Sequence, residues 1–172
     1  MANHSYLKNT ESIMSPDDVE AALRRIVDTH FDGAFSVDRW KDPQGDLAAW
    51  TLFLTETEGF QLWLTDEHNL EAPHSFAWAN AFHWVQDVIL CVLRERFGGN
   101  IYDDGVGFDE PLFTDCSSNA IYPFRKWWER IYGHFDGDIA QRVWDTEVLD
   151  GPDSAGDIMD LLRLGNEEYF DK

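Results

Sequence analysis

The sequence predicts an α+β fold. An antiparallel sheet of three or four strands is expected to pack on a long apolar helix, with a helical, acidic C-terminal half completing the chain. Three observations lead to this prediction. Between residues 35 and 64 apolar residues recur with the period of strands. From residue 76 to residue 93 the only formal charge is Asp87. Beyond residue 103, Gly, Pro, Ser and Asp separate short helical segments.

The composition argues for a folded chain in spite of its acidity. Acidic side chains number 33 against 13 basic ones, for a net charge of −20, and such an excess with few aromatics is typical of disorder. Here 44% of the residues are hydrophobic and 15% are aromatic, which is ample for a core. A length of 172 residues fits one domain. We therefore expect a loose, polar N-terminal arm over residues 1–14 and a single domain over residues 15–172.

The first helix is expected to begin at Ser15-Pro16-Asp17-Asp18. The serine is a typical N-cap, proline suits the first helical position, and the carboxylates face the positive end of the helix dipole. The helix should end near His30, before Gly33. Its predicted buried stripe, at helical spacing, consists of Val19, Ala22, Leu23, Ile26 and Val27.

Three strands of a meander follow. Residues 35–40 alternate apolar with polar side chains, the period of a strand with one buried face. Residues 50–54 and 60–64 flank a loop that ends in Glu58-Gly59, the pattern of an antiparallel hairpin. A fourth strand at the sheet edge is expected around Ile101-Tyr102.

A long helix is expected from residue 76 to residue 97, with Ser75 as its cap and Gly98-Gly99 as its stop. Because this segment is apolar around most of its circumference, it should form the centre of the core. Three shorter helices are predicted over residues 122–132, 139–147 and 158–164. Residues 103–172 hold 17 acidic and 6 basic side chains, so the C-terminal part is the more densely acidic.

The charge indicates a basic partner. An acidic protein is attracted to basic surfaces such as those of a nuclease, a toxin or a DNA- or RNA-binding complex, and long-range attraction raises the rate of association. The same field disfavours direct binding of nucleic acid and attachment to anionic membranes. We therefore expect a non-enzymatic antagonist, which acts either as a DNA mimic of the anti-defence kind used by phages and mobile elements or as a toxin-neutralising immunity protein. Carboxylates aligned on one elongated face would favour the mimic, whereas a compact acidic patch ringed by aromatics would favour the immunity protein.

The predicted partner-binding residues combine carboxylates with two tryptophans. Adjacent helical positions point about 100° apart, so one of the tryptophans is expected to be a surface anchor. Arg125, Lys126 and Arg130, which lie beside them, are interpreted as balancing acidic neighbours. The complete predicted set is Asp136, Asp138, Asp145, Glu147, Asp150, Asp153, Asp157, Asp160, Trp127 and Trp128.

Two other classes of function remain open. One is an enzyme that uses loop carboxylates, or a small-molecule-binding protein, either of which would need a concave apolar pocket with converging polar groups. The other is a subunit of a larger assembly, marked by an uncharged aromatic patch. The histidines match no metal-ligand spacing, and no cofactor is expected. Cys91 and Cys116 are expected to be reduced thiols in a cytoplasmic protein, because neither a signal peptide nor a membrane span is evident.

Overall fold

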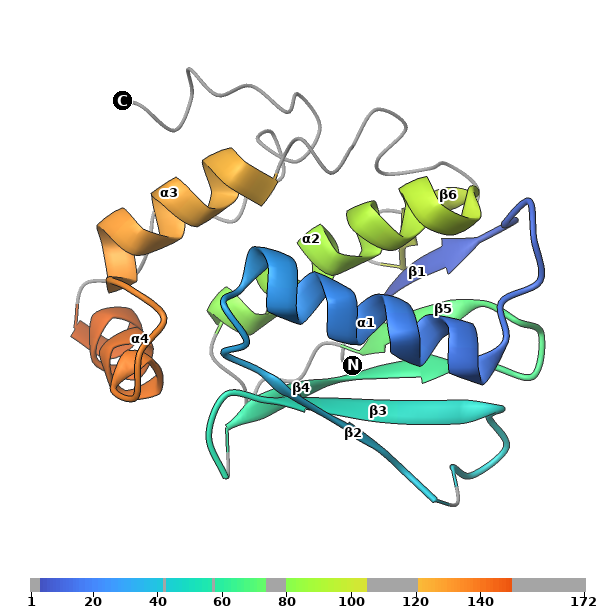
Figure 1. The fold of residues 1–172 in the computed structure, drawn as a ribbon, viewed down its shortest axis with the longest axis horizontal. Helices are drawn as coiled ribbons and strands as arrows, with labels where there is room; N and C mark the ends of the chain where they lie inside the picture. Colours follow the sequence, from blue (N-terminus) through green and yellow to red (C-terminus); the bar gives the residue numbers. More distant parts are fainter. Residues whose placement is uncertain (1–3, 42, 57, 74–79, 105–120, 150–172) are drawn as a thin grey trace.

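The computed structural model describes residues 4–41, 43–56, 58–73, 80–104 and 121–149 (Figure 1). Within these residues six strands form one antiparallel sheet in the order β2-β3-β4-β5-β1-β6. The strands are β1 His4–Lys8, β2 Ser36–Arg39, β3 Ala48–Phe53, β4 Gly59–Leu64, β5 Leu70–Pro73 and β6 Asn100–Asp103. The helices are α1 Pro16–His30, α2 Asn80–Phe97, α3 Ile121–Tyr132 and α4 Ile139–Leu149.

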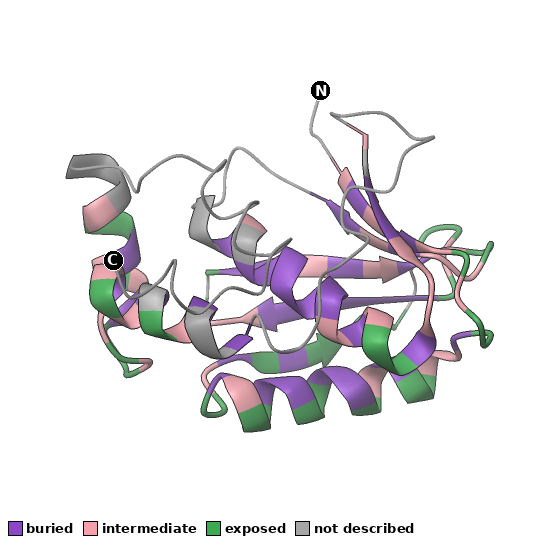
Figure 2. Ribbon diagram, turned by 90° about the horizontal axis from the view of Figure 1, so that it is seen from above, coloured by how far each residue is buried: buried purple, intermediate pink, exposed green. Residues whose placement is uncertain are grey.

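Helices α1 and α2 lie side by side on one face of the sheet, and α3 and α4 lie beyond one end of α1 and α2 (Figure 1). One continuous core joins the sheet to all four helices, and Figure 2 shows its buried residues where α2 faces the strands. The prediction of a mixed helical and antiparallel fold is confirmed. The predicted number of strands is wrong, because the sheet has six.

The N-terminal residues form a strand inside the sheet, where a loose arm over residues 1–14 was expected. β1 lies between β5 and β6 and pairs antiparallel with both, so that Tyr6 is opposite Glu71 on one side and Tyr102 on the other. Leu7 and Met14 are fully buried in the core. The alternation of buried and half-buried side chains along β1 is that of a strand covered on one face.

Helix α1 follows its predicted boundaries. The Ser15 hydroxyl accepts a hydrogen bond from the Asp18 amide at 3.2 Å, and Pro16 occupies the first turn. The five apolar residues of the predicted stripe are all buried. The β3–β4 hairpin is confirmed as well, with Trp50 opposite Leu62.

Helix α2 differs from the long apolar helix that was expected. It spans 18 residues in the described part, and the predicted cap Ser75 and first helical residues lie outside that part. Its buried surface includes the polar residues Gln86 and Asp87, and its last turn carries Arg94 and Arg96. The amide of Gln86 donates to the carbonyls of Gln61 and Pro73 at 2.9 and 3.0 Å, so a polar side chain fixes α2 against β4 and β5.

The Gly98-Gly99 stop is confirmed at the end of α2. Both glycines have positive φ, at 78° and 91°. A Cβ at Gly99 would lie 2.3 Å from the Lys8 carbonyl oxygen, so only glycine lets the chain pass β1 this closely as it enters β6.

The predicted helices at residues 122–132 and 139–147 are confirmed as α3 and α4, whereas the one predicted at 158–164 lies outside the described residues. α3 is tied to the end of α1 by Arg125, which donates to Asp32 at 2.6 Å. Phe135, in the α3–α4 loop, stacks on Trp128 with ring centroids 5.3 Å apart. These contacts join the C-terminal helices to the core of the sheet.

Candidate functional site

The predicted acidic residues fall into three groups in the structure. Asp136, Asp138 and Asp145 are exposed in α4 and the loop before it. Glu147 belongs to α4, but its side chain lies outside the described part. Four further predicted residues are outside the described residues: Asp150, Asp153, Asp157 and Asp160.

Asp136 is engaged within the molecule. Its carboxylate accepts a hydrogen bond from Arg142 Nη1 at 2.9 Å, and the same guanidinium donates to the carbonyls of Tyr132 and His134 at 2.7 and 2.5 Å. Hydrogen bonds from Arg142 and from the Asp138 amide lower the pKa of Asp136. Arg142 therefore holds the α3–α4 loop in place, and the Asp136 carboxylate is one of the three groups that it binds.

The N-terminal part of α4 and the residues just before it form a groove with the β3–β4 hairpin. One hollow, of about 430 Å³, is lined by Glu58 from the hairpin and by Asp138, Gln141 and Trp144 from the α4 segment. A second hollow, of about 540 Å³, shares Thr55 with the first. It is lined by β2, by the end of β3 and by the start of the hairpin. We call the two hollows together the acidic groove.

Among the described residues that line the acidic groove there are four carboxylates and no Lys, Arg or His. Its four acidic side chains, all exposed, are Asp38, Glu56, Glu58 and Asp138. Within the described part of the chain none of them forms an ion pair, whereas Asp17, Asp32 and Asp136 are each paired with an arginine. The negative charge of the groove is therefore not balanced by neighbouring side chains of the described residues.

Trp144 supplies an exposed aromatic surface in this groove. It is 53% exposed and is the most exposed of the described aromatic side chains. Trp40, the other exposed tryptophan in the described residues, donates its indole N–H to Thr51 on its own sheet at 2.7 Å. Trp144 makes no such bond with the described residues, so its ring and its N–H are open to a partner.

The predicted aromatic anchors are only partly tested. Trp128 is fully buried among Phe124, Tyr132 and Phe135, so it is not the exposed member of the pair, and the prediction that one of the two tryptophans is a surface anchor stays a prediction. The side chain of Trp127 lies outside the described part. Arg125 pairs with Asp32 and Glu129, as expected for a residue that balances acidic neighbours.

The hairpin carboxylates and Trp144 were not predicted from the sequence. Among the described side chains of α4 the buried ones are Ile139 and Val143, four residues apart. That spacing places Trp144 about 100° from Val143, toward the flank of the helix, and this signal could have singled it out. No sequence pattern places Glu58 beside α4, because their proximity depends on how α4 packs against the sheet.

A second polar cluster lies on the face of the sheet that α1 and α2 leave open. Nδ1 of His4 contacts the Glu71 carboxylate across the β1–β5 pair, and the rings of Tyr6 and Trp63 lie 6.1 and 6.3 Å from the imidazole. Burial raises the pKa of Tyr6 to about 12, with the charges of Glu71 and Asp104 adding to the effect. These contacts hold β1 in register with β5, and we assign the cluster to the stability of the sheet.

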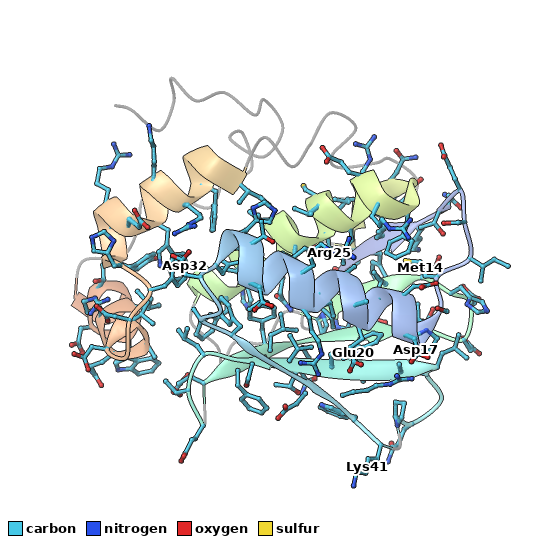
Figure 3. All side chains as sticks on the ribbon, in the orientation of Figure 1. Met14, Asp17, Glu20, Arg25, Asp32 and Lys41 are labelled. Atoms are coloured by element: carbon cyan, nitrogen blue, oxygen red, sulfur yellow. The ribbon has the colours of Figure 1, made fainter. Side chains whose placement is uncertain are left out.

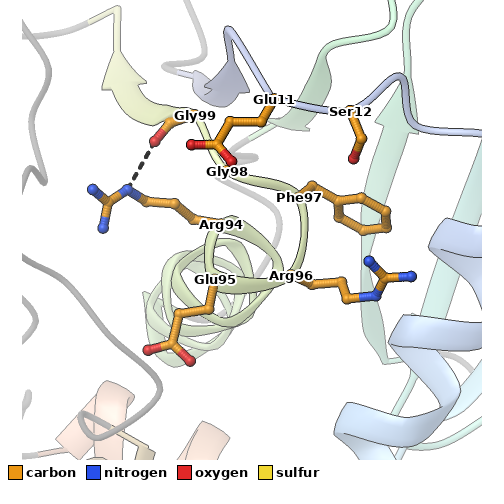
Figure 4. Close-up of a pocket in the computed structure, with 8 residues that line it drawn as sticks. All are labelled: Glu11, Ser12, Arg94, Glu95, Arg96, Phe97, Gly98 and Gly99. Atoms are coloured by element: carbon orange, nitrogen blue, oxygen red, sulfur yellow. Dashed lines mark hydrogen bonds between the residues drawn. The ribbon is translucent and has the colours of Figure 1, made fainter.

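An open hollow of about 590 Å³ lies at the C-terminal end of α2 (Figure 4). It is lined by two arginines and two glutamates, Arg94, Arg96, Glu11 and Glu95. Arg94 donates to the Gly99 carbonyl at 2.9 Å. Because both positive and negative side chains line this hollow, it is not uniformly acidic as the acidic groove is.

The described residues also bear on membrane spans and metal sites. Among them there is no helix with the length and apolar character needed to cross a membrane. The same residues contain no group of three or more His, Cys, Asp or Glu side chains placed to hold a metal ion. Cys91 is buried and forms no disulfide with a described residue, and Cys116, also predicted to be reduced, is outside the described part.

The chain matches no protein-family model, and no curated protein and no solved structure is significantly similar to it. Its function is therefore inferred from the site alone.

Proposed function

We propose that this protein is a non-enzymatic antagonist that binds a basic, nucleic-acid-binding surface of another protein through the acidic groove. The observation that carries the proposal is the exposed ring of Trp144 in one hollow with Glu58 and Asp138, beside a second hollow lined by Asp38 and Glu56. None of these four carboxylates forms an ion pair with a described residue. Tryptophan is among the residues that most often dominate the energy of an interface, and surrounding charges steer the encounter.

The form of the groove favours a toxin-neutralising protein over a mimic of DNA. Duplex DNA presents about one charge per 1.7 Å of its axis, so a mimic needs a long row of carboxylates. The acidic groove instead brings Glu58 and Asp138 into one hollow with Trp144, and its other two carboxylates line the adjoining hollow. Other acids of the described part are distributed over the surface, at the start of α1, at its end and in the β4–β5 turn (Figure 3).

The test is a capture experiment with charge-matched variants. Immobilised wild-type protein and the variants E58Q/D138N and D66N/E67Q are exposed to the basic proteins of the source cells, and bound proteins are eluted with salt and with duplex DNA. Both double variants lose two negative charges, and Asn retains the capping ability of Asp at position 138. Asp66 and Glu67 lie in the β4–β5 turn, at the opposite end of β4 from the groove.

The proposal expects a nucleic-acid-binding protein that is retained by the wild type and by D66N/E67Q, is released by duplex DNA, and is lost from E58Q/D138N. Equal retention by all three proteins would contradict it. So would equal loss from both variants, because binding would then follow net charge rather than the groove.

A further inference from the structure

A small apolar crevice separates α1 from α2, away from the acidic groove. Its walls are Ala22 and Ile26 of α1 and Val92 and Leu93 of α2, and Arg25 and Arg96 line it as well. In Figure 3 Arg25 lies on the side of α1 that faces α2. Figure 4 shows Arg94 and Arg96 pointing to different sides of α2, with Arg96 directed toward α1. The crevice thus joins apolar walls with cationic side chains from two helices.

The two arginines stand out in so acidic a chain. Arg24, Arg39, Arg125 and Arg142 each form an ion pair with a carboxylate. Arg25 and Arg96 form none with any described residue, and the only partner of Arg96 among those residues is the ring of Phe97, 5.2 Å from its guanidinium carbon. Their positive charge is thus available to a ligand.

His30 lines the same crevice beside Thr29. Burial lowers the pKa of this imidazole, and the nearby Arg125 lowers it further. His30 is therefore neutral at pH 7, and the positive charge of the crevice comes from the arginines.

The volume of the crevice limits the size of the apolar part of a ligand. The crevice measures about 140 Å³, close to the ~150 Å³ of an apolar cavity that accepts benzene. A guanidinium binds a carboxylate through two parallel hydrogen bonds, which fixes the orientation of the ligand.

We infer that the α1–α2 crevice binds a small monocarboxylate whose apolar part is about the size of one aromatic ring. The ring occupies the space between Ile26 and Leu93, and the carboxylate lies at the mouth, within reach of Arg25 and Arg96. This site shares no residue with the acidic groove, so it stands whether or not the proposed antagonist function holds.

The test is a titration of the full-length protein with benzoate, followed by the backbone amide resonances in NMR spectra. Benzamide, a neutral analogue of the same shape, and acetate, which lacks the ring, are the comparison probes. The inference expects saturable shifts at Thr29, Val92 and Leu93 with benzoate. Both comparison probes should bind at least about tenfold more weakly, because each lacks one of the two recognised features.

The variant R25Q/R96Q identifies the residues responsible, and R130Q is the matched control, because Arg130 is an exposed arginine of α3 that lies outside the crevice. Benzoate should bind R25Q/R96Q at least about tenfold more weakly than the wild type and should bind R130Q unchanged. Both arginines of the crevice are exposed, so the variants should keep the wild-type melting temperature. Shifts that do not saturate, equal binding of benzamide, or full affinity in R25Q/R96Q would each overturn the inference.

Discussion

At the scale of single residues, Arg142 joins three acceptors at the junction of α3 and α4. Its guanidinium donates hydrogen bonds to two backbone carbonyls and to the Asp136 carboxylate. These bonds hold the end of α3 close to the start of α4. The acidic groove depends on this arrangement, because it fixes where Asp138 and Trp144 stand relative to the hairpin.

The variant R142A should lower the free energy of unfolding by about 1–3 kcal/mol, because it removes the charged donor of three acceptors. The free energy of unfolding of R142K should lie between those of the wild type and R142A, since an ammonium cannot reproduce the planar set of donors of a guanidinium. Urea unfolding measures both. R130A is the control. An equal loss of free energy of unfolding in R130A and R142A would contradict the role of Arg142 in holding the loop.

The titration of Asp136 gives a test that depends on pH. Its pKa lies below the ordinary value of 3.8, so the ionised carboxylate is favoured by folding. The contribution to stability is therefore complete above pH ~4 and is lost as the pH falls through the lowered pKa. NMR of the Asp136 carboxyl carbon should give a midpoint below 3.8 in the wild type and a higher midpoint in R142A, in which the Arg142 hydrogen bond is lost and the one from the Asp138 amide remains. A midpoint at 3.8 in both proteins would contradict the hydrogen bond.

The tryptophans show a limit of predicting from sequence which aromatic side chains are exposed. An expected anchor, Trp128, is buried, whereas Trp144 is exposed. Both lie in amphipathic helices, and which face of such a helix is covered is decided by its neighbours. For α3 those neighbours include Phe135 from the next loop, a contact that no local pattern in α3 indicates.

At the scale of elements, the sequence predicted those with a strong local signal. α1 has a capping serine, an N-terminal proline and five apolar residues at helical spacing, and it was placed to within one residue. The strands β1 and β5 were missed because their signals are weak. β1 carries a single large aliphatic residue, Leu7, and β5 is four residues long and ends in proline. Their pairing is set by contacts between distant parts of the chain, which short patterns do not encode.

The inclusion of β1 in the core leads to a direct prediction. Leu7→Ala should cost about 2–5 kcal/mol of stability, because the side chain is fully buried and its loss leaves a cavity. Ile13→Ala makes a similar aliphatic truncation at a site that is 76% exposed, and it should cost less than about 0.5 kcal/mol. Chemical denaturation of the two variants decides between a strand and a loose arm. Equal, small losses would indicate an arm.

At the scale of the whole molecule, the net charge of −20 acts on stability as well as on binding. Like charges repel more strongly in the compact state than in the unfolded chain, and salt screens this repulsion. The free energy of unfolding should therefore rise as NaCl is increased from about 10 mM to about 300 mM, where the Debye length falls to less than 10 Å. Urea unfolding across this range measures the effect, and a decrease with salt would show that attractive ion pairs outweigh the repulsion.

The charge was the feature of the sequence from which a basic partner was predicted, but it could not show which carboxylates act together. In the structure Asp136 is committed to Arg142, while Glu58 of the hairpin joins Asp138 across a groove. The number of charges is a property of composition. Their grouping depends on the packing of α4 against the β3–β4 hairpin, and only the three-dimensional fold supplies it.

In the proposed function the acidic groove binds the partner, its carboxylates accelerate association, and Trp144 holds the complex together. The most direct measurement is the binding kinetics of the captured partner with the wild type, W144A, E58Q/D138N and D66N/E67Q at several salt concentrations. We expect E58Q/D138N to associate about threefold to tenfold more slowly and with a weaker salt dependence. W144A should dissociate at least about tenfold faster with little change in association. Wild-type kinetics in both groove variants, or equal effects in D66N/E67Q, would contradict the claim.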